Sequence, residues 1–354
     1  MVNMHCFIGY SLMMMLSRKL ESIWYSNEPP NILLKLLALC FKLVSVIRQQ
    51  LYKLQILKQI KVKVPVIVVG NITTGGTGKT PVTVWLVEIF QKAGMTVGVI
   101  SRGYGGTQPR KRPALVTKSN DAVEYGDEPV YIAKKTDTLV CVCTDKVKAA
   151  KTLISKGAEV IISDDGLQHY HLARDFEILI IDSVRGFGNG YLLPAGPLRE
   201  NPKRAQMTDW ILLNGDGNNF DESLSKDIQC NRFKLLNTTA VNHSGTVKKL
   251  ISDFSGSEVY LLAGISNPER LLKILEDNDI SVIQIEIDDH GKVDLSAIRE
   301  DTNTPILMTP KDAVKYDLGL HQNCWIMEPE VEFDDSYRLP EFIQTLVRNN
   351  HEPV

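Results

Sequence analysis

A glycine-rich loop between a short apolar run and an amphipathic segment is the feature that most constrains this chain. Residues 64–70 are rich in valine and isoleucine, residues 75–80 are Gly-Gly-Thr-Gly-Lys-Thr, and apolar side chains recur at helical spacing from Val82 to Phe90. This order predicts a buried strand, a phosphate-binding loop and a helix in direct succession. Gly75, Gly76 and Gly78 allow the loop N–H groups to turn inward, and the start of the helix adds a positive dipole end. The stretch therefore predicts a nucleotide phosphate site.

The last two residues of this loop have distinct expected roles. Lys79 would reach the β and γ phosphates of ATP, and the Thr80 hydroxyl would bind Mg²⁺. The usual P-loop pattern has a glycine six residues before the lysine, whereas this chain has Thr73. The alternative interpretation is a glycine-rich strand-to-helix turn with a surface lysine. We favour the phosphate loop because the strand, the glycines, the Lys-Thr pair and the helix occur together.

Two further predicted strands end in polar side chains suited to such a site. Residues 96–100 lead to Arg102 and Tyr104, and residues 160–163 lead to Asp164 and Asp165. P-loop enzymes present a carboxylate to Mg²⁺ from the end of a strand. Ligands bind at the carboxyl ends of parallel strands, so we expect these side chains to face the nucleotide. A plain glycine turn after Arg102 and an Asx turn at the aspartates are the alternatives.

A second acidic pair, Asp127 and Glu128, lies just before a predicted helix. Helix capping is the simplest role for carboxylates at this position, because they accept hydrogen bonds from free N–H groups and favour the helix dipole. Spacing alone leaves this role and a catalytic one equally open.

The alternation of strand and helix patterns predicts the fold class. Residues 61–228 suit a P-loop α/β/α domain with a doubly wound, mostly parallel sheet, 229–250 a two-stranded linker, and 251–354 a smaller C-terminal α/β domain. A length of 354 residues fits two domains.

Six cysteines without paired spacing predict a reducing compartment. A net charge of −2 argues against nucleic acid as the main partner.

Residues 1–60 differ from the rest of the chain. Residues 31–47 are strongly apolar and contain only two lysines, and basic residues without acidic ones follow between Arg48 and Lys63. A basic flank beside an apolar helix is typical of a cytoplasmic membrane face. We therefore expect a membrane-associated helical segment, either lying on the bilayer or crossing it once. A helix packed on a soluble domain is the alternative.

Taken together, the motifs resemble the tetraacyldisaccharide 4′-kinase family, the lipid A 4′-kinases of Gram-negative bacteria. They occur in family order from about residue 20 to about residue 316. The motifs are Pro65 to Thr73, Gly75 to Pro81, Ser101 to Gly106, Gly126 to Pro129, Asp164 to His169, Pro194 to Glu200, Ala263 to Ile265, Asn267 to Arg270, Asp289-His290, and Lys311 to Lys315. The family also lacks the P-loop glycine, so Thr73 fits the resemblance.

The resemblance implies transfer of the γ-phosphate of ATP to the 4′-hydroxyl of an acylated glucosamine disaccharide 1-phosphate. It implies Mg²⁺, attachment to the cytoplasmic face of the inner membrane, and no obligate protein partner. Asp127 matches the general base of the family, and His290 matches its dyad partner from the second domain. The other implied roles are nucleotide binding for Thr73, Thr74, Gly75, Gly76, Thr77, Gly78, Lys79, Thr80, Arg102, Gln168 and Arg199, and metal binding for Thr80, Asp164, Asp165, Glu128 and Glu200.

The sequence departs from the family pattern at a few positions. Pro310 stands where relatives usually have an acidic residue, Gly291-Lys292 replaces a more apolar pair, and Lys146 stands where an arginine is expected. A lysine keeps the positive charge but loses the two-pronged guanidinium. A membrane-attached P-loop switch or partitioning ATPase is the alternative function. Such proteins have a second lysine just before the paired glycines, where this chain has Thr74.

Overall fold

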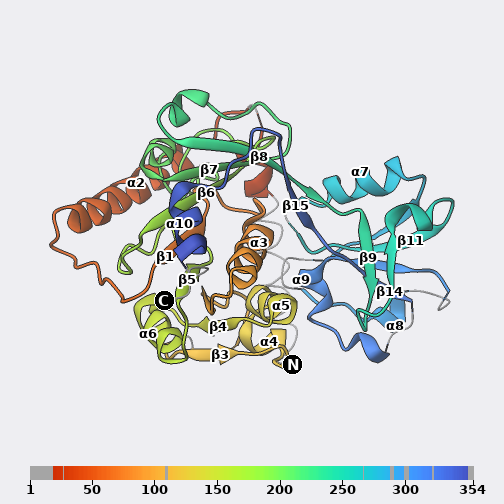
Figure 1. The fold of residues 1–354 in the computed structure, drawn as a ribbon. Helices are drawn as coiled ribbons and strands as arrows, with labels where there is room; N and C mark the ends of the chain where they lie inside the picture. Colours follow the sequence, from red (N-terminus) through yellow and green to blue (C-terminus); the bar gives the residue numbers. More distant parts are fainter. Residues whose placement is uncertain are drawn as a thin grey trace, which may run out of the picture.

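The computed structural model describes residues 19–26, 28–107, 111–265, 267–287, 291–298, 303–320 and 323–349, without the side chains of residues 296, 297 and 320. It contains two mixed, mostly parallel sheets that lie side by side (Figure 1). The chain is therefore an α/β protein, as its strand and helix pattern predicts. His290 and the adjacent Asp289 lie outside the described residues.

The larger sheet has nine strands in the order β15-β8-β7-β6-β1-β5-β2-β4-β3. Its members are β1 (Val66–Gly70), β2 (Val97–Ser101), β3 (Ala114–Val116), β4 (Leu139–Val142), β5 (Val160–Ser163), β6 (Phe176–Asp182), β7 (Trp210–Asn214), β8 (Gln229–Leu236) and β15 (Glu330–Phe333). Only the edge strands β3 and β15 run antiparallel to their neighbours. The central strand β1 pairs with β5 and β6, so the loops that follow these three strands share one edge of the sheet.

Helices cover both faces of this sheet, because its central strands are apolar on both sides. Ile67 and Val69 of β1 point into one buried cluster, and Val66 and Val68 point into the other. The surrounding helices are α3 (Lys79–Lys92), α4 (Ala122–Tyr125), α5 (Asp127–Thr136), α6 (Lys146–Ser155) and α10 (Glu341–Asn349), with two 3₁₀ turns at Pro202–Met207 and Glu222–Ser225. The sheet thus forms the middle layer of three.

The smaller sheet has six strands in the order β10-β9-β14-β13-β11-β12. They are β9 (Thr239–Asn242), β10 (Lys248–Leu250), β11 (Glu258–Leu262), β12 (Ser281–Ile285), β13 (Ile306–Met308) and β14 (Cys324–Met327). The associated helices are α7 (Glu269–Asp277), α8 (Leu295–Ile298) and α9 (Pro310–Ala313), with 3₁₀ turns at Ile251–Phe254 and Leu318–Leu320. Strands β12, β11, β13 and β14 are parallel, and β9 and β10 continue the sheet in antiparallel fashion.

The chain passes between the two sheets twice. It leaves the larger sheet after β8 and enters the smaller one at β9, then returns from β14 to β15. Helix α10 follows β15 and packs on the larger sheet, where the Phe342 ring stacks on Phe176 at 5.2 Å between centroids and Ile343 is fully buried. We expected residues 251–354 to lie together in the second domain, but β15 and α10 belong with the first sheet. Apolar side chains on α10 complete a core that β1 to β8 leave open.

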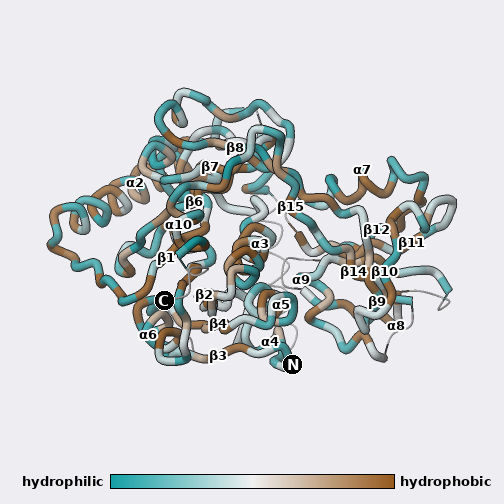
Figure 2. The backbone as a smooth tube through the Cα atoms, viewed as in Figure 1, coloured by the Kyte–Doolittle hydropathy of each residue, from teal (hydrophilic) through white to brown (hydrophobic). Residues whose placement is uncertain are grey.

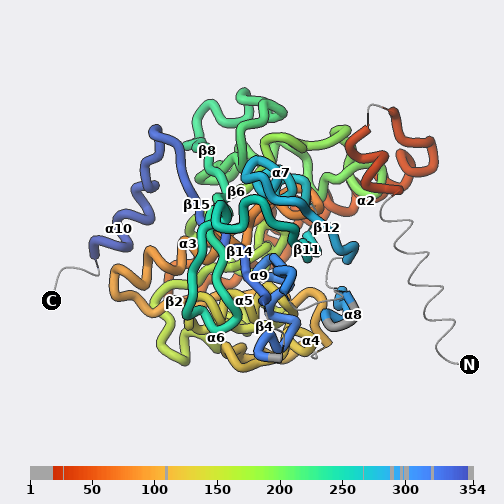
Figure 3. Tube along the Cα trace, turned by 90° about the vertical axis from the view of Figure 1, so that its right-hand side faces the viewer, coloured from red at the N-terminus to blue at the C-terminus, as the bar shows by residue number. Residues whose placement is uncertain are grey.

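Helix α2 (Ile32–Lys53) projects from the side of the larger sheet (Figures 1 and 3). Asn31 caps its start, because the Asn31 side chain accepts a hydrogen bond from the Leu34 N–H at 2.9 Å. Ala38 is its only buried residue, and Figure 2 shows hydrophobic residues along much of its length. None of the helices within the described part of the chain combines the length and apolar character needed to cross a bilayer.

Candidate functional site

The phosphate loop joins β1 to α3 as the sequence predicts, and it rests against two other loops. The Thr74 N–H donates to the Pro197 carbonyl at 2.8 Å, and the Asn214 side-chain amide donates to the Thr77 carbonyl at 3.0 Å. Gly78 has a φ of +94°, and a Cβ there would lie 2.8 Å from the Asn214 amide nitrogen. Glycine is therefore required where the loop turns into α3.

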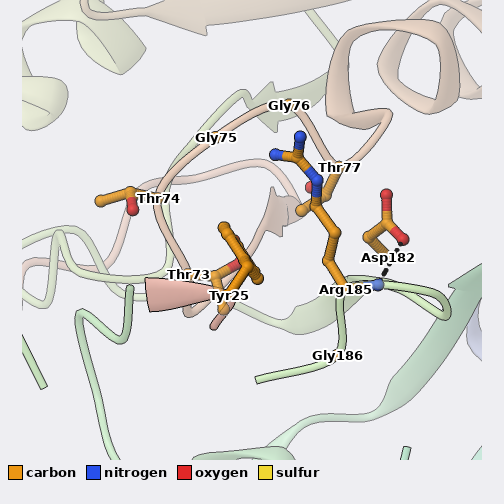
Figure 4. Close-up of a pocket in the computed structure, with 9 residues that line it drawn as sticks. All are labelled: Tyr25, Thr73, Thr74, Gly75, Gly76, Thr77, Asp182, Arg185 and Gly186. Carbon is orange, nitrogen blue, oxygen red and sulfur yellow. Dashed lines mark hydrogen bonds between the residues drawn. The ribbon is translucent and has the colours of Figure 1, made fainter. Parts of the chain in front are cut away.

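The loop surrounds a small pocket of its own. Thr73 to Thr77 form an arc around the Tyr25 ring and the Arg185 side chain, with Asp182 alongside (Figure 4). The Arg185 backbone N–H donates to Asp182 at 3.0 Å, and its guanidinium lies 5.0 Å from the Tyr25 ring centroid. A segment before α2 thus contributes to the wall of the phosphate site, which the sequence did not indicate.

The two aspartates after β5 have opposite electrostatic environments. Asp165 has a positive φ of +44° and receives two hydrogen bonds from Arg199 at 2.9 and 3.0 Å, with Lys79 Nζ 3.9 Å away. Burial would raise the pKa of Asp165, but the positive charges of Lys79 and Arg199 outweigh it and hold the pKa well below its ordinary value. Asp165 is therefore an ionised carboxylate that orders two cations.

Asp164 is almost completely buried and accepts a hydrogen bond from the Thr83 hydroxyl at 3.2 Å. Burial, followed by the negative charges of Glu128 and Asp165, raises the pKa of Asp164 to about 7. An added positive charge at this carboxylate would favour its ionised form. The positive charges of Lys79 and Lys146 only partly oppose this rise in pKa, so Asp164 has the chemistry of a cation ligand.

Lys146 lies beneath both aspartates and fixes the loop that carries them. Its Nζ donates to the Ser163 hydroxyl at 2.9 Å and to the Asp164 carbonyl at 2.7 Å, with the Asp165 carbonyl at 3.4 Å. Burial lowers its pKa to about 8, although the charges of Asp165 and Asp164 act in the opposite direction. The sequence indicated Lys146 only as a departure from the family pattern. The structure shows that it supports the loop from below.

The second acidic pair begins helix α5. Gly126 precedes it with a φ of +96°, and a Cβ there would lie 2.7 Å from the Tyr104 carbonyl oxygen. Asp127 is buried and is the first residue of α5, so its Oδ1 accepts the N–H of the next residue, Glu128, at 3.1 Å and does not cap the helix from the position before it. Two lysines from the smaller sheet's side also face this pair. Lys311 lies 3.6 Å from Glu128, and Lys315 lies 3.7 Å from Asp127.

Three further predicted site residues lie near the phosphate loop and the two acidic pairs: Gln168, Glu200 and Arg102. The Gln168 amide donates to the Asn71 carbonyl at 3.0 Å, next to the phosphate loop. Glu200 is buried, and it accepts a hydrogen bond from the Tyr170 hydroxyl at 2.9 Å. Burial raises the pKa of Glu200, which the charge of Arg204 partly opposes. Arg102 is exposed at the edge of the cleft.

A cleft of about 1590 Å³ between the two sheets brings most of these residues together. It is lined by Thr74, Gly75, Gly76, Thr77, Gly78, Lys79, Thr80, Arg102, Glu128, Asp164, Asp165, Gln168, Arg199 and Glu200. Thr73 lines the small pocket within the loop instead, and Asp127 is buried and precedes the cleft residue Glu128 in the chain. The cleft also reaches Phe41, Val44 and Arg48 of α2 and Arg270 of α7. It is therefore large enough for more than a nucleotide.

Comparison with known proteins identifies the family. The model of the Tetraacyldisaccharide-1-P 4'-kinase family, LpxK, matches residues 30–348. The chain belongs to this family. The tetraacyldisaccharide 4'-kinase of Actinobacillus succinogenes is 43% identical over 315 residues, which are 88% of this chain and 93% of that protein. The corresponding enzyme of Mannheimia succiniciproducens is 39% identical over 327 residues, which are 92% and 97% of the two chains.

A solved structure agrees with the sequence comparison. The LpxK of Aquifex aeolicus, crystallised in complex with ATP, is 25% identical and superposes with a TM-score of 0.71 over 89% of this chain and 98% of that one. The chain is thus a tetraacyldisaccharide 4′-kinase, an ATP-dependent enzyme of lipid A biosynthesis that phosphorylates tetraacyldisaccharide 1-phosphate at the 4′ position. The resemblance expected from the sequence motifs is confirmed.

Patterns in the sequence did not indicate Asn214, and they gave Lys315 no role in the site. Asn214 ends β7 and connects the phosphate loop to Arg270 of α7, which donates to the Asn214 side chain at 2.8 Å. Lys315 belongs to a family motif but has no expected role. Asn214 could have been predicted from its position, because it is a polar residue at the end of β7, the strand beside β6. No local pattern indicates what Lys315 faces, because its partner Asp127 is far away in sequence.

Proposed function

We propose that this kinase binds ATP with its β and γ phosphates on the loop from Thr73 to Thr80 and transfers the γ-phosphate to the lipid 4′-hydroxyl at Asp127. The glycines open the loop N–H groups to the phosphates, and Lys79 adds a positive charge. Arg199 also pairs with Asp165 and would neutralise further phosphate charge. The complex of the Aquifex relative with ATP supports ATP as the nucleotide.

The acidic residues fit a Mg²⁺ ion that is held jointly with ATP. Among the described residues, no group of three or more His, Cys, Asp or Glu side chains is placed to bind a metal without other ligands. In nucleotide sites Mg²⁺ usually takes one or two carboxylates, with water and phosphate oxygens as the remaining ligands. Asp164 and Glu128 suit this role, because burial and then the charge of Glu128 raise the pKa of Asp164, and a cation would favour its ionised form. Thr80 is the hydroxyl ligand expected from the loop.

When bound, Mg²⁺ would supply positive charge that offsets the negative charge developing on the phosphates. Asp165 and Glu200 are the remaining proposed metal-facing carboxylates. Both already have protein partners, Arg199 and Lys79 for the first and Tyr170 and Arg204 for the second. We propose that they act mainly by ordering those partners around the phosphates.

Asp127 is the group that would accept the proton of the lipid hydroxyl. In the reaction, the 4′ oxygen forms a bond to the γ phosphorus, the bond from that phosphorus to the β–γ bridging oxygen breaks, and ADP leaves. The hydroxyl proton passes to the Asp127 carboxylate, which makes the oxygen a better nucleophile. Burial of Asp127 at the start of α5, beside the cleft and close to the second sheet's lysines, is the observation that carries this proposal. His290 remains the predicted dyad partner.

The test is ATP-dependent phosphorylation of tetraacyldisaccharide 1-phosphate in detergent micelles, with wild-type enzyme and Asp127→Asn. We expect product from the wild type and a loss of kcat of at least about 10²-fold in the variant, with ATP affinity nearly unchanged. Asn keeps the size of the side chain and removes the proton acceptor. Retention of full activity would show that Asp127 isn't the base, and folded, ATP-binding wild type without product would contradict the kinase assignment.

We also propose that α2 lies on the cytoplasmic surface of the inner membrane. Its exposed apolar residues include Ile32, Leu36, Leu39, Leu43 and Val44, each more than half exposed to solvent. A patch of this kind on a helix is typical of an interfacial membrane site. Exposed basic residues follow at Arg48, Lys53, Lys58, Lys61 and Lys63, where anionic headgroups would attract them. The cleft reaches α2, so a membrane-bound lipid could enter it without leaving the bilayer.

Vesicle flotation tests this placement. Replacing Leu39 and Leu43, each 61% exposed, by glutamate should release the enzyme from anionic vesicles and raise the KM for lipid presented in vesicles. Leu250→Glu is the matched control, because Leu250 is 54% exposed on the smaller sheet and should leave binding unchanged. Equal binding of the double variant and the control would exclude α2 as the membrane contact.

A further inference from the structure

Arg270 is a cation that reaches from the smaller sheet's side of the cleft to the larger sheet. It lies in the first turn of α7, and its side chain is 33% exposed. Its Nη1 donates to the Asn214 side-chain oxygen at 2.8 Å. Its Nη2 donates to the Asn214 backbone carbonyl at 3.0 Å and lies 3.4 Å from Asp182 Oδ1. Oxygens at the ends of β6 and β7 thus hold one guanidinium.

The larger sheet fixes these acceptors by itself. Asp182 is buried, and its Oδ1 also accepts the N–H groups of Val184 at 2.9 Å and Arg185 at 3.0 Å. Asn214 is buried as well. The backbone passes so close to the guanidinium that a Cβ on Gly215 would lie 2.7 Å from Nη2. The guanidinium therefore occupies a closely fitted site at the ends of two strands.

The side-chain amide of Asn214 extends this contact to the phosphate loop. A guanidinium has N–H donors and no acceptor, so the Asn214 atom that faces it must be the oxygen. The amide nitrogen is then directed at Thr77, whose carbonyl accepts a hydrogen bond from it at 3.0 Å. In a planar trans peptide the N–H points opposite to the C=O, so this bond directs the Gly78 N–H away from the Asn214 amide. Arg270 thus determines the orientation of the Asn214 amide and of the peptide bonded to it.

We propose that Arg270 is a positioning residue for the phosphate loop: through Asn214 it fixes the Thr77–Gly78 peptide so that the Gly78 N–H faces the phosphates of ATP. This inference rests on the proposed placement of the ATP phosphates on the loop. Without the guanidinium, the Asn214 amide is free to turn over and present its oxygen to the Thr77 carbonyl, where two acceptors repel each other. The loop then loses the hydrogen bond that holds its last turn before α3.

This contact makes nucleotide binding depend on where the smaller sheet lies. Helix α7 follows β11 of that sheet, so a displaced sheet withdraws the guanidinium from Asn214. Arg270 also lines the cleft, and its positive charge attracts phosphate whatever the orientation of Asn214. The two effects are separable, because only the first requires the Asn214 side chain.

The test is a double-mutant cycle on the affinity of the complete enzyme for ATP with Mg²⁺, measured by equilibrium titration without lipid. Arg270→Met removes the donors and the charge. We expect ATP affinity to fall by at least about 10-fold, because hydrogen bonds from a charged donor are lost. In the Asn214→Ala background the same substitution should lower affinity by less than about 2-fold, because Arg270 acts through that amide. An undiminished loss in this background would show that Arg270 acts by its charge, and would overturn the inference.

Arg232→Met is the matched control. Arg232 donates to the carbonyls of Gly215 at 3.4 Å and Gly217 at 2.8 Å, so it binds the same loop after β7 through backbone oxygens. Its loss should leave ATP affinity unchanged. Equal losses of affinity in Arg232→Met and Arg270→Met would show general loosening of this loop. A lower melting temperature of Arg270→Met with wild-type affinity would show a purely structural role. Either result would overturn the inference.

A second variant keeps the test decisive if Arg270→Met does not fold. Gly215→Ala keeps Arg270 and its charge, but the added Cβ forces the guanidinium to shift from Asn214. We expect ATP affinity to fall by less than in Arg270→Met. Gly157→Ala introduces the same strain at a φ of +94° in open space and should leave affinity unchanged. Wild-type affinity in a folded Gly215→Ala enzyme would count against the inference.

Lys79→Met separates this inference from the proposal on which it rests. Lys79 belongs to the phosphate loop itself, so its loss should lower ATP affinity whatever Arg270 does. Unchanged affinity in Lys79→Met would refute the proposed placement of the phosphates. Loss of affinity in Lys79→Met, together with wild-type affinity in Arg270→Met, would refute only the role of Arg270.

Discussion

The two acidic pairs of the cleft are held by different means. Asp164 and Asp165 follow β5 and are fixed by Lys146 and Arg199, which also belong to the larger sheet and its loops. Asp127 and Glu128 begin α5, also on the larger sheet, but the lysines that face them come from the smaller sheet's side. The part of the site around Asp164 and Asp165 is thus assembled by the larger sheet and its loops. The part around Asp127 and Glu128 depends on how the smaller sheet lies against the larger one.

This difference suggests that nucleotide binding and phosphoryl transfer can be disturbed separately. Disturbing the first pair should weaken nucleotide binding and the chemical step together, because the same loops contact the phosphates. Disturbing Asp127, the member of the second pair that is not assigned to Mg²⁺, should lower the rate of phosphoryl transfer while ATP still binds. The predictions below test this separation.

Gly126→Ala should have the largest effect and should act on the second pair alone. A Cβ would meet the Tyr104 carbonyl oxygen at 2.7 Å, so the start of α5 and Asp127 must shift. Displacement of a reacting group by about 1 Å can cost about 10²-fold in rate. We expect a loss of kcat of this size, with ATP affinity changed by less than a few-fold, measured by steady-state kinetics and nucleotide titration.

Gly157→Ala is the control for this substitution. Gly157 has a φ of +94°, nearly the same as that of Gly126, but no atom lies within 4 Å of an added Cβ. Its replacement should cost about 1 kcal/mol of stability from the left-handed backbone alone and leave kcat unchanged. Equal kinetic losses in the two alanine variants would show that strain and not displacement of Asp127 is responsible.

Lys146→Met should have an intermediate effect on the first pair. It leaves the Ser163 hydroxyl and the carbonyls of Asp164 and Asp165 without their buried donor. Unpaired buried polar groups cost about 1–3 kcal/mol each, so we expect the free energy of unfolding in urea to fall by about 2–4 kcal/mol. ATP affinity and kcat should fall together, in contrast to Gly126→Ala. Lys146→Arg keeps the charge and should retain more of both, and unchanged ATP affinity in Lys146→Met would contradict the separation.

The smallest effect concerns the pH dependence of stability next to the first pair. Burial, assisted by the charges of Lys146 and Arg102, lowers the pKa of His169 to about 3 from its usual 6.5. Between these values the unfolded chain binds a proton that the folded protein doesn't, so His169 makes the protein less stable as pH falls. Asp164, whose pKa is raised to about 7, acts in the opposite direction over much of the same range.

His169→Gln should therefore remove the acid-sensitive component. We expect the free energy of unfolding of wild type, relative to this variant, to decrease between pH 6.5 and pH 5 by no more than about 1 kcal/mol per pH unit after solvent screening. Urea titrations at several pH values measure the difference. A constant difference between the two proteins would mean that His169 doesn't titrate as a buried imidazole.

Much of the fold follows from local patterns in the sequence. The apolar runs at β1, β5 and β6 are short and β-branched, the loop after β1 is rich in glycine, and the expected helix α3 follows this loop directly. Each feature involves neighbours in sequence, so spacing and residue type are enough to predict it. The placement of β15 and α10 on the larger sheet could not be predicted this way, because their partners β8 and Phe176 are about 100 or more residues away.

The sequence by itself determined the phosphate loop, the order of strands and helices, and the family, because strand, turn and helix patterns are local and the motifs keep their order. Only the tertiary structure decided which charges compensate one another. Three contacts join distant segments in this way. Arg199 pairs with Asp165, Lys146 donates to the carbonyl of Asp164, and Lys315 lies between Asp127 and Asp312. The energy of a buried charge depends on which other charges lie within a few ångströms, and sequence distance does not fix that.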